Sequence, residues 1–211
     1  MRSTFAAASV LVLMLVPGAF GDGPASRGPL YTPVGIWSHL IDPKVKAELG
    51  ITKAQDTGVQ RCLKKWQEKD LSDAGTIYKM QRPNKEAKVN ALLKQRADEL
   101  FQSLGQVLTA RRVSRLKQIL LQKLGITLFD YPEIRAALKL SDDKVPLLKS
   151  IYEQEYNEIV KDTLAGRISQ QEALKRRNAL ASGVSARVRA ALTEDQRKTL
   201  QALLGAPYAV Q

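Results

Sequence analysis

The sequence has one cysteine, one histidine and few aromatic residues, which make up 6% of its 211 residues. A zinc site needs three or four ligands, so Cys62 and His39 cannot form one within a single chain. A lone histidine leaves little scope for Ser-His-Asp or Cys-His catalysis. Neither a Gly-rich phosphate loop nor a CxxCH haem motif is present. We therefore expect a non-enzymatic protein without metal or cofactor.

Closely spaced acidic residues are the remaining candidates for catalysis. The pairs are Asp142-Asp143, Glu153 with Glu155, and Glu194-Asp195. Residues one or two positions apart do not face each other on a helix, whereas carboxylates that cooperate in hydrolysis must flank one bond. We expect these residues to be cap charges and parts of solvated helix faces.

Strand patterns are also missing. From about Trp37 onward the apolar residues recur at helical spacing, and no sustained apolar/polar alternation of the kind found in strands occurs. The sequence therefore predicts an all-α fold, built as antiparallel helical hairpins or a bundle.

The one long apolar run lies at the N-terminus. Arg2 is followed by a run of twelve residues at 5–16, and Ala19-Phe20-Gly21 offers a cleavage site. A membrane-spanning helix needs roughly 20 apolar residues. We expect residues 1–21 to be a signal peptide, with an uncleaved interfacial anchor as the alternative. The sequence therefore predicts a bacterial protein that is exported to the periplasm or the extracellular space. After cleavage it would have no transmembrane span.

Two features of the chain after the leader follow from its composition. Residues 22–36 contain six glycines and prolines, which predict a flexible or extended arm. Cys62 has no second cysteine to pair with, and it lies at helical spacing from Val59 and Trp66. A buried thiol is the simplest interpretation, and an intermolecular disulfide is the alternative.

Helix starts are marked by polar residues that can accept or donate at exposed main-chain groups. The capping residues that we identify are Thr52, Gln55, Thr109, Ser141, Ser169, Glu172, Thr193 and Gln196, with Leu192 before the last pair. They predict helices over 53–69, from 109 to Gly125, from 141 to Gly166, from 169 and from 193 to Gly205. Asn84 and Pro132 open two more, and a loop is expected around 70–83.

The pattern of helix starts repeats along the chain. Pro43 to Gln55 aligns with Pro132 to Lys144, and Leu108 to Leu120 aligns with Leu192 to Leu204. We therefore expect two tandem copies of a four-helix unit, at 37–125 and 126–206, followed by a tail at 207–211.

One helix start resembles a known motif. Leu192-Thr193-Glu194-Asp195-Gln196 fits the LTxxQ motif of the Spy/CpxP family of bacterial periplasmic helical proteins, and Ile51 to Gln55 has Ile in place of Leu. The segments at 108–112 and 140–144 lack the Gln. The arrangement also looks like that of exported helical proteins with no assigned activity. The Spy/CpxP resemblance implies an α-helical, often dimeric protein with a chaperone or envelope-stress role. That family's concave basic cradle cannot be transferred residue by residue.

The net charge of +12 is concentrated in two stretches. Residues 101–125 hold five basic and no acidic residues, and residues 167–191 hold six basic residues and one acidic residue. The candidate partner-binding residues are Arg111, Arg112, Arg115, Arg176, Arg187 and Arg189. A solubilising helix surface is the alternative to a binding face. Trp and Phe are sparse in both stretches, and the chain carries an export signal, so nucleic acid is not an expected partner.

The combined features predict a chaperone-like binding protein or envelope-stress modulator. Its partners would be unfolded or acidic proteins, steered to the basic face and held by apolar contact. The rival prediction is a structural envelope protein that binds an anionic polymer or lipid headgroups by charge alone. A homodimer is compatible with either.

Overall fold

The computed structural model describes residues 29–79, 85–181 and 185–208 of the chain. Every regular element in these ranges is a helix, and the described residues contain no strand. The all-α fold class is therefore confirmed for this part of the chain. Among the same residues, no helix combines the length and the apolar character that crossing a membrane would require. The predicted signal peptide lies outside the described residues.

The chain divides into two compact units, Met1–Val113 and Ser114–Gln211, which we call the N-terminal unit and the C-terminal unit. The division falls within α6 (Ala110–Leu124), whereas the predicted boundary between sequence repeats follows residue 125. The tandem repeat at 37–125 and 126–206 stays a prediction.

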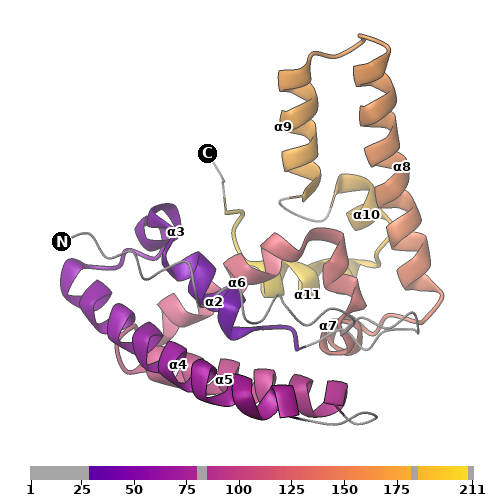
Figure 1. Ribbon diagram of the computed structural model, residues 1–211. Helices are drawn as coiled ribbons and strands as arrows, with labels where there is room; N and C mark the ends of the chain where they lie inside the picture. Colours follow the sequence, from indigo (N-terminus) through magenta and orange to yellow (C-terminus); the bar gives the residue numbers. More distant parts are fainter. Residues whose placement is uncertain (1–28, 80–84, 182–184, 209–211) are drawn as a thin grey trace. The chain divides into compact units, whose positions relative to one another are not determined.

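In the N-terminal unit two long helices, α4 (Lys53–Lys79) and α5 (Lys85–Gly105), pack side by side (Figure 1). The short helices α2 (Pro33–Leu40) and α3 (Pro43–Glu48) precede them, and α2 contacts both α4 and α5. The buried side chains come from all four helices: Ile36, Leu40, Val45, Val59, Leu63, Trp66, Leu100 and Leu104.

The first helix begins earlier than the sequence predicted. The segment at 22–36 was expected to be flexible or extended, yet α2 starts at Pro33. Thr32 caps it by accepting a hydrogen bond from the Gly35 amide at 3.1 Å, and Pro33 has the φ that a first helical residue needs. Tyr31 packs edge-on against Phe101, with ring centroids 5.3 Å apart, and burial raises the pKa of Tyr31 to about 12. Residues 22–28 of the predicted arm lie outside the described residues.

α4 is longer than predicted, because it continues to Lys79 and does not end at Lys69. Residues 70–79 contain Gly75 but no proline. A glycine within a helix costs only about 1 kcal/mol relative to alanine, whereas a proline costs about 3 kcal/mol, so the helix can continue through this segment.

The C-terminal unit contains the larger number of short elements. After α6 come η1 (Gly125–Asp130), a 3-10 helix, and α7 (Pro132–Leu138). A hairpin of α8 (Lys144–Leu164) and α9 (Gln170–Ala181) follows, and then α10 (Ala186–Ala190) and α11 (Glu194–Leu204) (Figure 1). Its core includes Leu116, Ile119, Leu128, Phe129, Ile134, Leu138, Leu148, Val188, Leu200, Leu204 and Tyr208.

Both predicted boxes that contain a glutamine form. Thr52 and Gln55 bond each other's main-chain amides at 3.2 and 3.3 Å, and Thr193 and Gln196 do so at 3.0 and 3.3 Å. The residue before the second box, Leu192, is buried. Each box gives a side-chain acceptor to two main-chain amides at a helix start, where the helix itself offers none.

Thr109 and Ser169 accept from a main-chain amide as predicted, but neither has the return bond that completes a capping box. Thr109 accepts from the Arg112 amide at 3.4 Å. Ser169 accepts from the Glu172 amide at 3.1 Å, while the Glu172 carboxylate pairs with Arg176.

The prediction for Ser141 was wrong. α8 begins at Lys144, with Asp143 in the cap position and no side-chain cap. The Ser141 hydroxyl bonds the Asp143 carboxylate instead and lowers the pKa of that group.

Gly58→Ala should destabilise the protein although alanine favours helices by about 1 kcal/mol. A Cβ at this position on α4 would lie 2.7 Å from Val107 Cγ1, and the branched valine has little rotamer freedom to move away. We expect the free energy of unfolding to fall by about 1–3 kcal/mol in urea denaturation. Gly105→Ala is the matched control, since no atom lies within 4 Å of its added Cβ. An equal response of both variants would contradict the close packing at Gly58.

The hydrogen bonds to Glu99 predict that the protein loses stability in acid. Lys69, Arg96 and Gln95 donate to its carboxylate at 2.9, 2.8 and 3.0 Å, and these bonds lower its pKa from 4.5 to about 2. Because the folded-state pKa is the lower one, the stabilisation is present above pH 4.5 and disappears as the pH falls toward 2. Urea denaturation from pH 6 to 2 should show a smaller loss for Glu99→Gln than for the natural protein. Glu133→Gln, which removes an exposed carboxylate elsewhere, is the matched control, and an equal change in both variants would contradict the role of Glu99.

Candidate functional site

Arg112 is part of the fold of the N-terminal unit. Its guanidinium donates to the Gly50 carbonyl and to Gln55 Oε1, both at 2.7 Å. The side chain is half-buried, and these bonds attach the start of α6 to the start of α4. A guanidinium with two charge-assisted bonds within its own unit is poorly placed to bind a partner. Its neighbour Arg111 is exposed.

Arg115 has a similar role in the C-terminal unit. It donates to the Ala206 carbonyl at 2.7 Å and to Gln118 Oε1 at 3.4 Å. The side chain is half-buried. Of the three arginines predicted on α6, Arg111 is therefore the one whose side chain extends mainly into solvent.

Two predicted arginines form ion pairs on the surface. Arg187 on α10 contacts Glu158 at 3.0 Å and Glu155 at 4.0 Å, both on α8. Arg176 pairs with Glu172 one turn earlier on α9, at 3.0 Å. The arginine side chains remain 52% and 48% exposed. Exposed pairs contribute about 0–1 kcal/mol and exchange readily with other anions, so these two residues can still meet an acidic partner.

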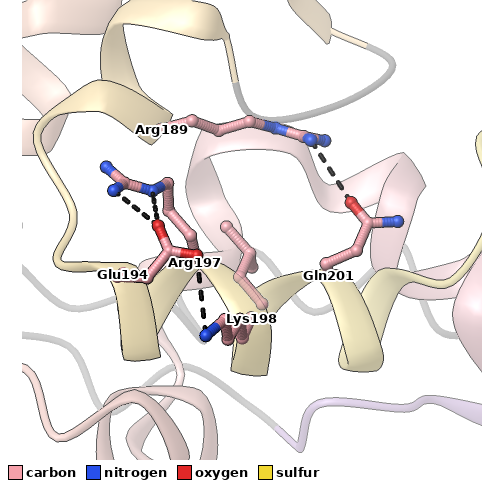
Figure 2. A pocket seen from close by; sticks show the side chains of 6 residues that line it. Arg189, Glu194, Arg197, Lys198 and Gln201 are labelled. Carbon is pink, nitrogen blue, oxygen red and sulfur yellow. Dashed lines mark hydrogen bonds and ion pairs between the residues drawn. The ribbon is translucent and has the colours of Figure 1, made fainter.

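The structure brings the sixth predicted residue, Arg189, together with two basic residues that the sequence analysis did not single out. Arg189 on α10 lies with Arg197 and Lys198 of α11 around a hollow of about 260 Å³ (Figure 2). Glu194, Leu200 and Gln201 complete the lining. We call this site the cationic hollow. Arg197 and Lys198 follow Glu194 at the spacing of ion pairs along one helix, and these positions alone do not show that Arg189 of α10 lines the same hollow.

Hydrogen bonds orient the two arginines of the cationic hollow, and Lys198 forms a longer ion pair. Figure 2 shows Glu194 between Arg197, at 2.8 Å, and Lys198, at 3.8 Å. Arg197 also donates to the Leu192 carbonyl at 2.8 Å. The bond from Arg197 lowers the pKa of Glu194, so its carboxylate stays ionised and offsets one of the three positive charges.

An acidic ligand would meet mainly Lys198 and Arg189 in the cationic hollow. The Lys198 side chain is 71% exposed, and the Arg189 guanidinium donates to Gln201 Oε1 at 3.3 Å. Leu200, which also lines the hollow, is only 2% exposed, so the hollow offers a ligand charge and hydrogen bonds but little apolar surface. The arrangement suits a carboxylate.

Exposed apolar side chains occur on the α8–α9 hairpin of the same unit. Leu164 is 84% exposed and Leu174 is 53% exposed, and Leu147 and Tyr156 are also open to solvent. Leu180 on α9 is buried, whereas Leu174 on the same helix is exposed, and the sequence analysis did not identify the exposed leucines. Periodicity alone does not show how much of a helix its neighbours cover.

The single histidine and cysteine make local contacts in the N-terminal unit. His39 Nδ1 lies 2.7 Å from the Gly35 carbonyl oxygen, and the Cys62 thiol donates to the Ser103 carbonyl at 3.6 Å. Cys62 is half-buried, and burial raises the pKa of its thiol. Across residues 29–79, 85–181 and 185–208, no cluster of three His, Cys, Asp or Glu side chains is arranged to hold a metal ion.

Arg112→Ala should lower the free energy of unfolding by about 2 kcal/mol, because it removes two charge-assisted bonds to the Gly50 carbonyl and Gln55. Arg111→Ala removes the same charge from the neighbouring exposed position and should change stability by less than about 0.5 kcal/mol. Urea denaturation of both variants tests this assignment. Equal stability of the two variants would mean that Arg112 is not needed for the fold.

Comparison of the chain with protein-family models, with curated proteins and with solved structures finds no match. The function must therefore be inferred from the described side chains, above all from the cationic hollow and the exposed hairpin leucines of the C-terminal unit.

Proposed function

We propose that this protein is an exported, non-enzymatic binding protein that holds acidic or partly unfolded segments of other proteins, in the manner of a periplasmic chaperone. The observation that carries the proposal is the cationic hollow, where Arg189, Arg197 and Lys198 converge on one small surface. A local excess of positive charge attracts acidic segments and speeds their association.

Apolar contact is the second component of the proposed binding. Leu164 and Leu174 expose most of their surface on the α8–α9 hairpin, in the same unit as the cationic hollow. Burying apolar area yields roughly 25 cal/mol per Å², and this contribution survives in high salt. A client with both acidic and apolar residues can therefore bind more tightly than charge alone permits.

The export route and the family resemblance belong to the same proposal. A leader at 1–21 would direct the chain out of the cytoplasm, and the LTxxQ-like helix starts suit a periplasmic helical protein. Thr193 and Gln196 of that motif cap α11, the helix that carries Arg197 and Lys198. The motif thus has a structural role beside the proposed binding surface.

Binding to an anionic polymer or lipid headgroup by charge alone is the second candidate. The net charge of +12 supports it. Attraction between exposed charges is screened over a few ångströms at high ionic strength, so this mode should disappear at about 0.5 M salt. A labelled peptide containing Glu and Leu, compared with polyglutamate, separates the two. Retention of the peptide at high salt supports the chaperone-like mode, and loss of both ligands overturns it.

Lys198→Glu should weaken binding of the Glu- and Leu-containing peptide about tenfold at low salt, because it places a like charge where the peptide carboxylates bind. Lys175→Glu on α9 is the matched control, with the same change of charge away from the cationic hollow. Fluorescence anisotropy titrations measure both dissociation constants. An equal loss in the two variants would show that overall charge governs binding and that the hollow does not.

A further inference from the structure

The end of α11 and the residues after it are held against α6 by one buried side chain. Gln122, which is 5% exposed, donates to the carbonyls of Leu204 and Ala206 at 2.6 and 2.8 Å. It also accepts from the Tyr208 amide at 2.6 Å. A buried amide without such partners would be strongly unfavourable, so this position requires a peptide backbone beside it.

Three more residues on the same side of α6 contact this segment. Arg115 donates to the Ala206 carbonyl at 2.7 Å, and Gln118 donates to the Ala202 carbonyl at 3.5 Å. The Lys123 ammonium lies 5.3 Å from the centre of the Tyr208 ring. Helical spacing brings the four α6 residues onto neighbouring positions of one surface. We call the surface formed by Arg115, Gln118, Gln122 and Lys123 the α6 peptide face.

Most of these contacts recognise the main chain and not the side chains of the segment. Two positions add selectivity. Gly205 has φ +66°, and a Cβ there would clash with the Gln118 side chain. Tyr208 is 6% exposed, with the Lys123 ammonium over its ring. The α6 peptide face therefore suits an extended segment that has a glycine and, three residues later, an aromatic residue.

We propose that the α6 peptide face is a binding site for extended peptide segments, and that residues 205–208 of the chain occupy it as an internal ligand. Gly205 joins the segment to α11, and a glycine can change its backbone angles without the steric cost that other residues incur. When residues 205–208 leave, Gln122 and Arg115 lose the Ala206 carbonyl and Gln122 loses the Tyr208 amide, while the bond from Gln122 to Leu204 in α11 stays. An incoming peptide with the same backbone groups restores these bonds, so internal and external segments compete for the site.

The α6 peptide face shares no residue with the cationic hollow, so the inference goes beyond the proposed binding of acidic segments. Gln201, which lines the hollow, also contacts the internal ligand. It accepts from Arg189 in the hollow at 3.3 Å and donates to the Gly205 carbonyl at 2.7 Å. Gly205 is the residue at which the internal ligand would swing away from α11, so Gln201 contacts both the hollow and this hinge residue.

The test uses the full chain and a labelled peptide, Leu-Leu-Gly-Ala-Pro-Tyr, with the sequence of residues 203–208. Tyr208→Ser removes the aromatic anchor of the internal ligand and leaves the α6 residues unchanged. If the internal ligand fills the site in about nine of ten molecules, its release should strengthen peptide binding about tenfold, measured by fluorescence anisotropy. Adding Gln122→Ala to this variant should abolish the gain.

Two controls make the result specific. Tyr156→Ser, at an exposed tyrosine on α8, should bind the peptide no better than the natural protein. A probe with Ala in place of Gly should bind poorly to the Tyr208→Ser variant, since alanine is strained at the φ of +66° that this position has. Equal peptide binding by folded Tyr208→Ser and Tyr156→Ser would overturn the proposal.

Hydrogen exchange of the natural protein provides a second measurement, which decides the question if Tyr208→Ser does not fold. An internal ligand that leaves the site exposes the Tyr208 amide, which otherwise donates to Gln122. This amide should exchange about a hundredfold faster than that of Leu120 in the buried part of α6, because local opening needs less free energy than global unfolding. Equal rates would mean that residues 205–208 are a permanent part of the fold.

Discussion

The structure depends on how the free carbonyl groups at the ends of its short helices are satisfied. A helix leaves its last four carbonyls without partners in the helix, and a chain with many short helices has many such groups. α6 carries the side chains that bond to several of them. Arg112 donates to Gly50 after α3, and Gln118 and Gln122 donate to Ala202 and Leu204 at the end of α11. Each unit thus uses its own part of α6 to fix the end of another helix.

Because α6 fixes other helices in this way, its basic residues do not all belong to a binding surface. The five basic residues at 101–125 suggest a binding surface, yet Arg112 and Arg115 donate to main-chain carbonyls inside their units. Net charge describes attraction at long range and does not tell which side chains are available. On α10 and α11, by contrast, Arg189 and Lys198 border an open hollow, with Glu194 as the neighbouring acid. The candidate surface is accordingly smaller than the basic stretches.

Main-chain recognition connects the fold with the proposed functions. A protein that binds many unfolded segments gains from contacts that every peptide can make, and backbone carbonyls and amides are such groups. Gln122 makes three of these contacts with residues 204–208. The exposed leucines of the α8–α9 hairpin offer the less directional apolar contact. Selectivity then rests on few features, such as a carboxylate in the cationic hollow or a glycine beside Gln118.

The sequence by itself determined the helical class and the start of most helices. Capping is local, because Thr52 with Gln55 and Thr193 with Gln196 need only three residues of separation to form their bonds. The rule failed at Ser141, because α8 begins at Lys144 and Asp143 occupies the cap position, and it did not fix the end of α4. A helix end depends on where packing stops, and one sequence window does not contain that information.

Only the tertiary structure decided what each basic residue does. Arg111 and Arg112 are adjacent and equally charged, yet Arg112 reaches partners 57 and 62 residues away while Arg111 faces solvent. Arg189 of α10 lines one hollow with Arg197 and Lys198 of α11, and Gln122 is buried because residues 204–208 fold back onto α6. These roles arise from long-range contacts, whereas composition and periodicity record only neighbours along the chain.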